Sequence, residues 1–549
     1  MSIDQLIRSA LADQKAGRLS QAAEKYRQVL SIEPANFHAL HFLGIVSSQM
    51  DQSQPAIDLI HRSLAINPNQ PDAWSNLSLI LARLNQLDQA INACHKAISL
   101  RPNYVNAHNN LGNLLRDLGQ LDQALTAYRK AQQLEPQNPT PHSSILFTLN
   151  FSPGQSPQSI LEEARRWNQL HSLPLAQHAH PHPNNPAPDR RLSIGYVSPD
   201  FRDHVVGRNL LPLLAHHDRS QFHITCYSGV NHPDEFTERF HPFADIWRST
   251  IGLSDRQLAQ LIRADRIDIL LDLSLHMANN RLQTFSLKPV PIQITFAGYP
   301  GTTGLTAIDY RLTDPRLDPP EHDPFYSEKS IRLPHSFWCY DPIDSSLPVS
   351  ALPAASTGQI TFGCLNNFCK INDQVLALWA RVLQQIPDAR MIILAPPGDH
   401  RLRLTDRLAV DSGRLKFIEY QSRPDYLQTY HRIDISLDTF PYNGHTTSLD
   451  ALWMGVPVVT LPGQTAVSRA GLSQLTNLNL TELIAANSDQ FIQIAVDLAS
   501  NLPRLIQLRA TLRQRMELSP LMNAPSFTRG IEDTYRTIWK KWCEQQPRP

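Results

Sequence analysis

The sequence carries no excess of either charge and no membrane-spanning run. Its 50 lysines and arginines balance 50 aspartates and glutamates, so the formal net charge is zero. Broad nucleic-acid binding needs a basic face, and this balance argues against it. No apolar run reaches about 18 residues, so we expect no membrane span. The opening MSIDQLIRSA has an early acidic residue and no apolar core, so we expect no secretory signal and a cytoplasmic location.

Paired cysteines and the common catalytic motifs are also missing. The six cysteines form no CxxC pair, which fits reduced thiols rather than a disulfide framework. The chain has no Walker motif, no GxSxG, no HExxH and no GxGxxG after a predicted strand. No DxD pair stands where a divalent metal would hold a diphosphate. We therefore expect neither a metal nor a bound cofactor, in a chain long enough for about two to four domains.

What the sequence does contain, first of all, is a 34-residue repeat. Prolines stand 34 residues apart with an alanine twelve residues before each: Pro34, Pro68, Pro102 and Pro136, with Ala22, Ala56, Ala90 and Ala124. Small residues where two helices touch and a proline after the second helix are typical of tetratricopeptide repeats. Residues 1–138 are therefore predicted to form an all-α solenoid of about four repeats. Such solenoids bind peptides or proteins on their inner face, so we expect a protein partner there.

Residues 139–189 are predicted to join the repeats to the rest of the chain. LEEARRWNQL within this range predicts a helix that belongs to a capping pair. Residues 171–191 are rich in Pro, His and Asn, which predicts a linker. His178, His180 and His182 alternate there, but no acidic or cysteine ligand accompanies them. A solvated linker is therefore favoured over a metal site.

Beyond the linker, short apolar strands alternate with helices. LSIGYVS, HITCYS, IDILLDLS and PIQITFAG predict a first lobe over 190–345, and QITFGCLN, ARMIILAP, RLKFIEY, IDISLDTF and PVVTLPG predict a second over 346–549. This alternation is typical of parallel, doubly wound sheets. The expected fold is an all-α tetratricopeptide solenoid followed by two doubly wound, Rossmann-like α/β lobes. Ligands of such sheets bind at the carboxyl ends of the strands.

The segment 438–463, DTFPYNGHTTSLDALWMGVPVVTLPG, predicts a diphosphate site. Thr446 and Thr447 stand just before an apolar-periodic helix, after a strand and a turn with Pro, Asn and Gly. Free N–H groups and the helix dipole make such a helix start a site for anions. Asp450, one turn later, is placed to accept hydrogen bonds from a ribose hydroxyl. The alternative is that the threonines only cap the helix and Asp450 only favours its dipole.

Loops after other predicted strands supply further candidates. Lys370 follows a strand of the second lobe, where its ammonium can neutralise a departing phosphate, an effect typically worth about 3–4 kcal/mol. His204 and His276 follow strands of the first lobe, and histidine is the usual proton shuttle near neutral pH. The loop from Gly298 to Gly304 follows a third strand of that lobe. The alternatives are a surface lysine, structural histidines and a tight turn.

Taken together, these segments resemble a known family. Repeats followed by GYVSPDF…H, FAGYPGTTG, TFGCLNNFCKI and DTFPYNGHTT…DALWMGVPVVTLPG are similar to the O-linked N-acetylglucosamine transferases and to the SPINDLY-like protein O-fucosyltransferases. The resemblance covers essentially the whole chain. It implies a two-lobed glycosyltransferase of the B type, inverting and metal-independent, that moves N-acetylglucosamine from UDP-N-acetylglucosamine to Ser or Thr hydroxyls of proteins.

The resemblance also implies roles for individual residues. His204 matches an active-site histidine of the first lobe, and Lys370 matches a lysine that contacts the diphosphate. The substrate-binding positions that it implies are Gly298 and Pro300 beside the donor sugar, Asn367, Tyr426 near the base, His445, Thr446 and Thr447 at the pyrophosphate, and Asp450 at the ribose. In the repeats, Asn76 and Asn110 match an asparagine ladder that binds the acceptor's backbone, while Phe42 takes the equivalent place one repeat earlier.

Departures from the family pattern keep the donor open. Tyr426 stands where the N-acetylglucosamine enzymes carry a histidine, and Asn367 and the HMANN segment at 276–280 are more like the SPINDLY branch. NGHTT at 443–447 and Asp450 are more like the N-acetylglucosamine branch. We favour UDP-N-acetylglucosamine because this last segment touches the donor. Protein O-fucosyl transfer from GDP-fucose is the alternative, as is a tetratricopeptide scaffold whose lobes bind a nucleotide sugar without turnover.

Overall fold

The computed structural model describes residues 1–178, 180–344 and 346–546. The chain divides into two compact units. The first contains Met1–Pro141 together with Ala395–Arg403, and the second contains His142–Leu394 together with Leu404–Pro549. Each unit is described in turn.

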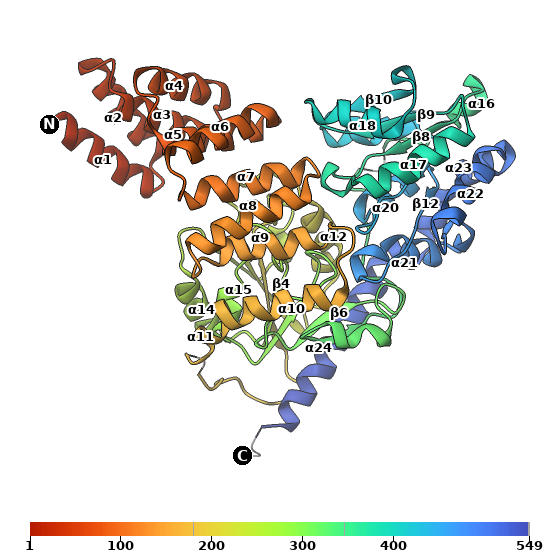
Figure 1. Ribbon diagram of the computed structural model, residues 1–549. Helices are drawn as coiled ribbons and strands as arrows, with labels where there is room; N and C mark the ends of the chain where they lie inside the picture. The colour runs from red at the N-terminus through yellow and green to blue at the C-terminus, as the bar shows by residue number, and fades with distance from the viewer. Residues whose placement is uncertain (179, 345, 547–549) are drawn as a thin grey trace. The chain divides into compact units, whose positions relative to one another are not determined.

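Helix pairs fill the first unit, as the 34-residue period predicts. The first helices of the pairs are α1 (Ile3–Lys15), α3 (Phe37–Gln49), α5 (Pro71–Arg83) and α7 (Val105–Asp117), and the second helices are α2 (Leu19–Ile32), α4 (Ser53–Ile66), α6 (Leu87–Leu100) and α8 (Leu121–Leu134) (Figure 1). Each second helix ends two residues before one of the periodic prolines, whose rings cannot continue it. The predicted all-α repeat fold is confirmed, and one helix pair precedes each of the four periodic prolines.

Small residues let the helices of each pair approach closely. The four periodic alanines of the second helices are fully buried. A Cβ on Gly44 would lie 2.7 Å from the Ile60 side chain, and one on Gly112 would lie 2.5 Å from the ring of Tyr128. Larger side chains at these positions would push the paired helices apart, and a close-packed interior has no room for that. The 34-residue period of the sequence therefore reflects the same helix–helix packing in each repeat.

A helical hairpin and a docked linker open the second unit. The hairpin consists of α9 (Pro139–Leu149) and α10 (Pro157–Trp167), followed by a short π-helix (Asn168–Ser172) and α11 (Leu173–Ala176). The predicted linker thus begins as helix. Its extended part is held to the first lobe through Asp268, whose carboxylate accepts hydrogen bonds from Arg190 at 2.5 and 2.7 Å and from Asn184 at 2.7 Å.

The first lobe is built on a parallel sheet of seven strands in the order β3-β2-β1-β4-β5-β6-β7. Its strands are β1 (Leu192–Ser198), β2 (Phe222–Ser228), β3 (Ile246–Ser249), β4 (Ile269–Asp272), β5 (Ile292–Thr295), β6 (Tyr310–Thr313) and β7 (Lys329–Arg332). Its helices are α12 (Val205–Ala215), α13 (Glu235–Glu238), α14 (Asp255–Ala264) and α15 (Leu282–Ser286), with 3-10 turns at His241–Phe243 (η2) and Pro320–Phe325 (η3). The strand order reverses between β1 and β4.

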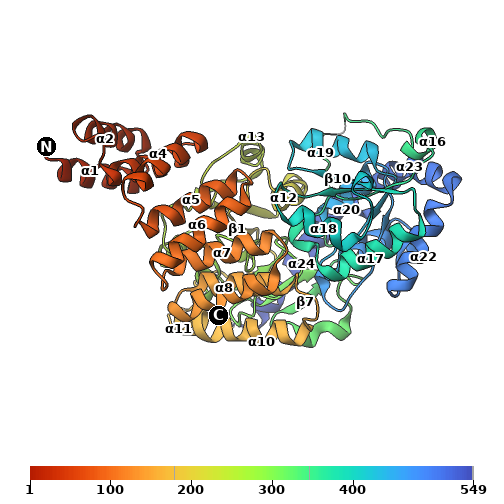
Figure 2. The ribbon, with the colours of Figure 1, turned by 45° about the horizontal axis from the view of Figure 1, so that its top comes forward.

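The second lobe has a parallel sheet of five strands in the order β10-β9-β8-β11-β12. Its strands are β8 (Thr361–Cys364), β9 (Arg390–Leu394), β10 (Leu415–Ile418), β11 (Ile435–Leu437) and β12 (Val458–Val459). Its helices are α16 (Pro353–Thr357), α17 (Asp373–Gln385), α18 (His400–Leu408), α19 (Arg423–Thr429), α20 (Thr446–Trp453), α21 (Ala470–Asn477), α22 (Ser488–Ala499) and α23 (Leu502–Glu517), seen from a second side in Figure 2. Its 3-10 turns are Phe368–Lys370 (η4), Ser412–Arg414 (η5), Tyr430–Arg432 (η6), Ala466–Ser468 (η7), Thr481–Leu483 (η8) and Pro520–Met522 (η9). The order reverses between β8 and β11, which makes the ends of these two strands the expected ligand position.

The last helix, α24 (Ala524–Glu544), returns to the first lobe although it follows the second in the chain (Figure 1). It packs against α12 and β5. The Tyr535 hydroxyl lies 3.1 Å from that of Tyr196, and Glu532 lies 2.9 Å from Nδ1 of His217. The sequence order places this helix in the predicted second lobe (346–549), whereas its packing is against the first lobe.

Among residues 1–178, 180–344 and 346–546, no helix has both the length and the apolarity needed to cross a bilayer. The same residues contain no group of three or more His, Cys, Asp or Glu side chains placed to hold a metal ion. The cysteines at 94, 226, 339, 364, 369 and 543 are all free thiols.

Candidate functional site

One buried carboxylate holds the turn that joins β11 to α20. Asp438 follows β11 directly and is 2% exposed. Its Oδ1 accepts hydrogen bonds from the N–H groups of Thr439 at 2.8 Å and Gly444 at 2.6 Å, and its Oδ2 accepts one from the Thr460 hydroxyl at 2.7 Å. Burial raises the pKa of Asp438 to about 6, although these hydrogen bonds work to lower it. The carboxylate thereby folds the turn back and fixes Gly444 at the start of α20.

Gly444 and the start of α20 leave backbone N–H groups for an anion. A Cβ on Gly444 would lie 2.1 Å from Oγ of Ser448 and 3.0 Å from Oδ1 of Asn366, so a side chain here would clash. His445, which lies between Gly444 and α20, occupies the N-cap position, and its side chain makes no hydrogen bond to the helix start. The N–H groups of Thr446 and Thr447 therefore lack a side-chain cap, and the helix dipole adds positive potential. Their donor-binding roles stay predictions, and this is the geometry that those roles require.

Lys370, at the end of η4, reaches the same turn. Its Nζ donates a hydrogen bond to the carbonyl of Asn443 at 2.8 Å and lies 4.3 Å from the centre of the Tyr442 ring. Burial lowers the pKa of Lys370 to about 8, while nearby negative groups, Asp438 among them, work to raise it. The ends of β8 and β11 thus bring a lysine ammonium to an uncapped helix start.

Of the two asparagines after β8, the first contacts α20. Asn366 is 5% exposed, accepts a hydrogen bond from the Thr447 hydroxyl and donates one to Oγ1 of Thr439 at 3.1 Å. Asn367, the predicted substrate-binding residue, is exposed and accepts a hydrogen bond from the N–H of Cys369 at 3.4 Å. The substrate-binding role of Asn367 stays a prediction. The two asparagines differ in burial: the buried stretch that begins in β8 includes Asn366 and ends before Asn367.

The first lobe contributes to the same site through the start of α12. His204 is the N-cap residue of α12. Asn209, further along the same helix, donates a hydrogen bond from Nδ2 to Oγ1 of Thr446 at 3.1 Å. No local sequence pattern marks Asn209, because its partner lies 237 residues away in the other lobe. This hydrogen bond places the helix that carries His204 against the helix that carries the threonines.

The hydrogen bonds of His204 indicate which ring nitrogen carries the proton. Its Nδ1 accepts a hydrogen bond from the N–H of Val206 at 3.2 Å and lies 3.6 Å from Oδ2 of Asp200. Burial lowers the pKa of His204, and Asp200 works to raise it. A neutral imidazole that accepts at Nδ1 carries its proton on Nε2. In this state His204 donates a hydrogen bond through Nε2 and is not ready to remove a proton there.

Asp450 is already bound by protein side chains. The Arg423 guanidinium donates to both of its oxygens, at 2.7 and 2.6 Å, so the pair is bidentate. The hydroxyls of Tyr340 and Tyr426 donate to it at 2.8 and 3.2 Å. A carboxylate has about four acceptor positions, and these four donors occupy them. A ribose hydroxyl would have to displace one of these donors, so the predicted ribose role of Asp450 requires a rearrangement.

His445 stands between the two lobes as a neutral ring. Its Nε2 lies 3.1 Å from the carbonyl of Val467, and Trp338 packs edge-on against it with ring centres 5.3 Å apart. Burial lowers the pKa of His445 well below its usual value, and the charge of Lys370 acts in the same direction. His445 therefore adds no second positive charge to the site at neutral pH.

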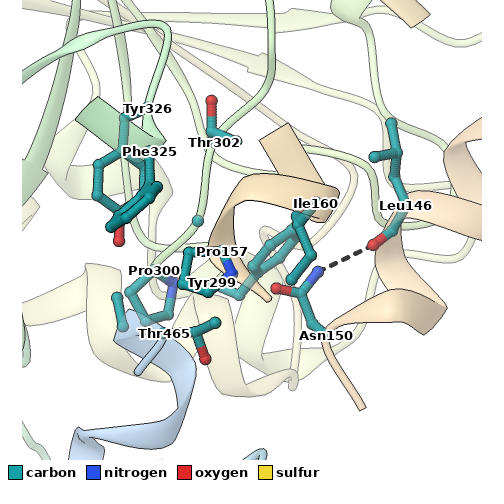
Figure 3. A pocket seen from close by; sticks show the side chains of 12 residues that line it. Leu146, Asn150, Pro157, Ile160, Tyr299, Pro300, Thr302, Phe325, Tyr326 and Thr465 are labelled. Carbon is teal, nitrogen blue, oxygen red and sulfur yellow. Dashed lines mark hydrogen bonds between the residues drawn. The ribbon is translucent and has the colours of Figure 1, made fainter. Parts of the chain in front are cut away.

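The loop after β5 lies close to the hairpin and lines a crevice. A Cβ on Gly298 would lie 2.9 Å from the carbonyl oxygen of Leu273, so the loop packs tightly on the end of β4. Pro300 lines a narrow crevice together with Tyr299, Leu146, Asn150 and Thr465 (Figure 3). Hairpin, first lobe and second lobe all contribute to this lining. The donor-sugar roles of Gly298 and Pro300 stay predictions.

His276 belongs to the structural framework of this loop. It is 2% exposed, and its Nδ1 and Nε2 lie 3.2 Å from Oγ of Ser143 and 2.8 Å from the carbonyl of Thr303. Burial lowers the pKa of His276 to about 3. Both ring nitrogens are within hydrogen-bond distance of protein groups, so His276 has the surroundings of a structural histidine rather than of a proton shuttle.

The two asparagines of the repeats contact the preceding repeat. Nδ2 of Asn76 lies 3.0 Å from Nε2 of His41, and Nδ2 of Asn110 donates to Oγ of Ser75 at 3.2 Å. Asn110 is 9% exposed. Their side-chain amides thus join neighbouring repeats, and their role in binding an acceptor backbone stays a prediction.

Two parallel, doubly wound lobes with the site at the carboxyl ends of the strands define the fold class of B-type glycosyltransferases. Residues 133–346 and 350–531 match glycosyl transferase family 41, and the chain belongs to this family. Residues 79–115 and 105–138 match tetratricopeptide repeats.

Relatives agree with this assignment. The chain is 40% identical over 368 residues to a protein of Arabidopsis thaliana called probable UDP-N-acetylglucosamine–peptide N-acetylglucosaminyltransferase SPINDLY. The aligned region covers 65% of this chain and 40% of that protein. A second Arabidopsis protein, similarly named with the ending SEC, is 30% identical over 372 residues, 65% of this chain and 38% of that protein. The structure of a mutant O-GlcNAc transferase of Thermobaculum terrenum matches with a TM-score of 0.88 and 35% identity, over 93% of this chain and 98% of that one. The chain spans less than half the length of the curated relatives that it matches.

Proposed function

We propose that this protein transfers N-acetylglucosamine from UDP-N-acetylglucosamine to serine or threonine hydroxyls of proteins. The observation that supports it best is the uncapped start of α20 with the Lys370 ammonium beside it. The names of the relatives, which describe N-acetylglucosaminyl transfer to peptides, point in the same direction. The tetratricopeptide repeats are the proposed contact for the protein acceptor.

The chemistry needs a stabilised leaving group and a positioned hydroxyl. The acceptor oxygen forms a bond to the anomeric carbon from the face opposite the diphosphate, the bond to the diphosphate breaks with inversion, and the hydroxyl proton passes to an oxygen of the departing diphosphate or to solvent. The leaving oxygens gain negative charge as this bond breaks. N–H groups fixed at a helix start and an ammonium stabilise that charge without reorganising. Metal independence is part of the proposal, because Lys370 and α20 supply the positive potential.

His204 enters the proposal as a hydrogen-bond donor. Its Nδ1 accepts from the N–H of Val206, so the imidazole presents an N–H at Nε2. Such a group suits a phosphate or sugar oxygen better than the proton of an attacking hydroxyl. We therefore propose that His204 orients the donor, and that its removal lowers transfer without shifting the pH dependence of kcat.

A donor screen tests the proposal. Purified protein is incubated with a proteome extract and either UDP-N-acetylglucosamine or GDP-fucose, and mass spectrometry records the added sugar and its site. We expect N-acetylhexosamine on Ser or Thr. Labelling by neither donor, with UDP still bound, would favour a non-catalytic nucleotide-sugar site. Full labelling after treatment with a chelator is expected and tests the metal-independent part separately.

Transfer of fucose from GDP-fucose is the second candidate, and the surroundings of Asp450 favour keeping it. In the N-acetylglucosamine branch the resemblance assigns this aspartate to a uridine ribose, whereas here Arg423, Tyr340 and Tyr426 occupy it. Deoxyhexose on the extract proteins, without N-acetylhexosamine, is the result that would make fucose the donor.

Asp438 offers a prediction about the diphosphate turn. Changing Asp438 to alanine removes the acceptor for two backbone N–H groups and one hydroxyl. If this costs about 1–2 kcal/mol of binding free energy, UDP affinity is expected to fall by about 5- to 30-fold. Changing Asp438 to asparagine keeps Oδ1 for the N–H groups, and the Thr460 hydroxyl can turn to accept from Nδ2, so affinity is expected to stay within about threefold. Titration calorimetry with UDP measures both, and equal losses in the two variants would contradict this account.

A further inference from the structure

Lys370 rests on an aromatic stack that begins in the helical hairpin. Its Nζ lies 4.3 Å from the centre of the Tyr442 ring. The Phe151 ring stacks on Tyr442 with ring centres 4.6 Å apart and planes 9° from parallel. Phe151 lies in the turn after α9, in a part of the chain that belongs neither to the predicted catalytic lobes nor to the repeats. Both rings are buried, at 3% and 6% exposed.

The Tyr442 ring, rather than its hydroxyl, makes these contacts. Its backbone carbonyl accepts a hydrogen bond from Thr439, which does not depend on the side chain. Among the described residues, no hydrogen-bond partner is found for the Tyr442 hydroxyl, whereas the ring contacts Lys370, Phe151 and His445. The face of an aromatic ring attracts an ammonium, more strongly where water is excluded. Two constraints, the ring and the Asn443 carbonyl, thus fix the direction of the lysine.

We propose that Tyr442 and Phe151 are positioning residues that fix the Lys370 ammonium for the departing diphosphate, so that the hairpin after the repeats takes part in catalysis. The inference rests on the proposed function, because it assigns the lysine its role there. The hydrogen bond to Asn443 uses one of the three N–H donors of the ammonium. The stack holds the other donors toward the start of α20. Without the ring, the flexible lysine stem samples other rotamers, and the ammonium leaves the place where charge develops.

The test compares two variants at one position. With UDP-N-acetylglucosamine and an acceptor peptide found in the screen, Tyr442→Leu is expected to lower kcat by about 10- to 100-fold with a smaller change in donor KM, because misplacing a stabilising group mainly raises the barrier. Tyr442→Phe keeps the ring and is expected to stay within about twofold of wild type. Phe151→Leu, which removes only the supporting ring, is expected to fall between them. A drop in kcat for Tyr442→Phe as large as that for Tyr442→Leu, or no drop for either, overturns the proposal.

A matched control separates positioning from general loosening of the hairpin. Ser143 also joins the hairpin to the first lobe, through His276, and accepts a hydrogen bond from the indole N–H of Trp167 within the hairpin, but it does not lead to Lys370. Ser143→Ala is expected to lower the thermal unfolding midpoint while leaving kcat unchanged. If Ser143→Ala lowers kcat as much as Phe151→Leu does, hairpin docking in general, not the stack, is responsible.

A readout without turnover keeps this inference distinct from the proposed function. Competitive labelling with an amine reagent, read by mass spectrometry, reports the accessibility of Lys370 against Lys288 as an internal reference. Removal of the ring in Tyr442→Leu is expected to increase relative labelling of Lys370 by about threefold or more, since the ring covers one side of the ammonium. If wild-type protein transfers no sugar, the proposed function fails, and unchanged labelling in Tyr442→Leu would still refute the stack by itself.

Discussion

Replacing Lys370 with alanine is expected to lower kcat for sugar transfer by about 10²- to 10³-fold, the loss that follows removal of one preorganised charge-stabilising group. The donor KM is expected to change less, because the ammonium matters most once the diphosphate begins to leave. Steady-state kinetics with purified donor and acceptor peptide measure both. The control is Lys416→Ala, an exposed lysine on β10 of the same lobe, which should behave as wild type. A Lys370→Ala variant with full kcat would remove the lysine from the mechanism.

The same lysine gives the pH dependence a direction. Burial lowers the pKa of Lys370 to about 8, so the free enzyme loses this positive charge as the pH rises through that value. We therefore expect kcat/KM, which reports the free enzyme, to decline above about pH 8. Bound diphosphate favours the charged form, so the decline in kcat is expected at higher pH. Lys370→Arg stays charged throughout this range and should lose the alkaline decline, even though its absolute rate is lower.

Periodicity made the repeats and most of the strands predictable from the sequence. The prolines and buried alanines recur because each helix pair packs in the same way, so one pattern describes every repeat. Strands β1, β2, β4 and β5 are buried over most of their length and read as apolar runs. Strands β3 and β7, by contrast, are only partly buried, and β3 lies at the sheet edge. Edge strands with one exposed face lack the continuous apolar run that predicts a fully buried strand.

The candidate site was predictable only where one segment carries it. Thr446 and Thr447 lie at a helix start that the sequence of residues 438–463 predicts without any other segment. Lys370 follows β8, one of the two strands between which the strand order reverses. Arg423, Asn209 and Tyr442 were missed because their partners come from other elements. Arg423 reaches Asp450 from α19, and Asn209 reaches Thr446 from the other lobe. Contacts that depend on how whole elements pack leave no local pattern in the sequence.

The buried pair of Arg423 and Asp450 leads to the second large expected effect. Their side chains are 14% and 3% exposed. Burial works to lower the pKa of Arg423, but the Asp450 carboxylate outweighs it and raises that pKa, so the guanidinium stays charged. Changing Asp450 to alanine leaves this charge buried without its partner, which costs about 3–5 kcal/mol. The thermal unfolding midpoint of the second lobe is then expected to fall by about 10 °C.

Two roles for Asp450 are separated by changing its partner as well. If the carboxylate mainly neutralises Arg423, the double variant with Arg423→Met and Asp450→Leu should regain most of the lost thermal stability, because no charge is left buried. If it mainly binds a ribose hydroxyl, Asp450→Ala should raise the donor KM about tenfold with an unchanged midpoint, and the double variant should regain nothing. Both oxygens of Asp450 are held by Arg423 at 2.6–2.7 Å before any donor arrives. For that reason we expect the first result, with the nucleotide selected by the two tyrosines and the arginine around the carboxylate rather than by the carboxylate itself.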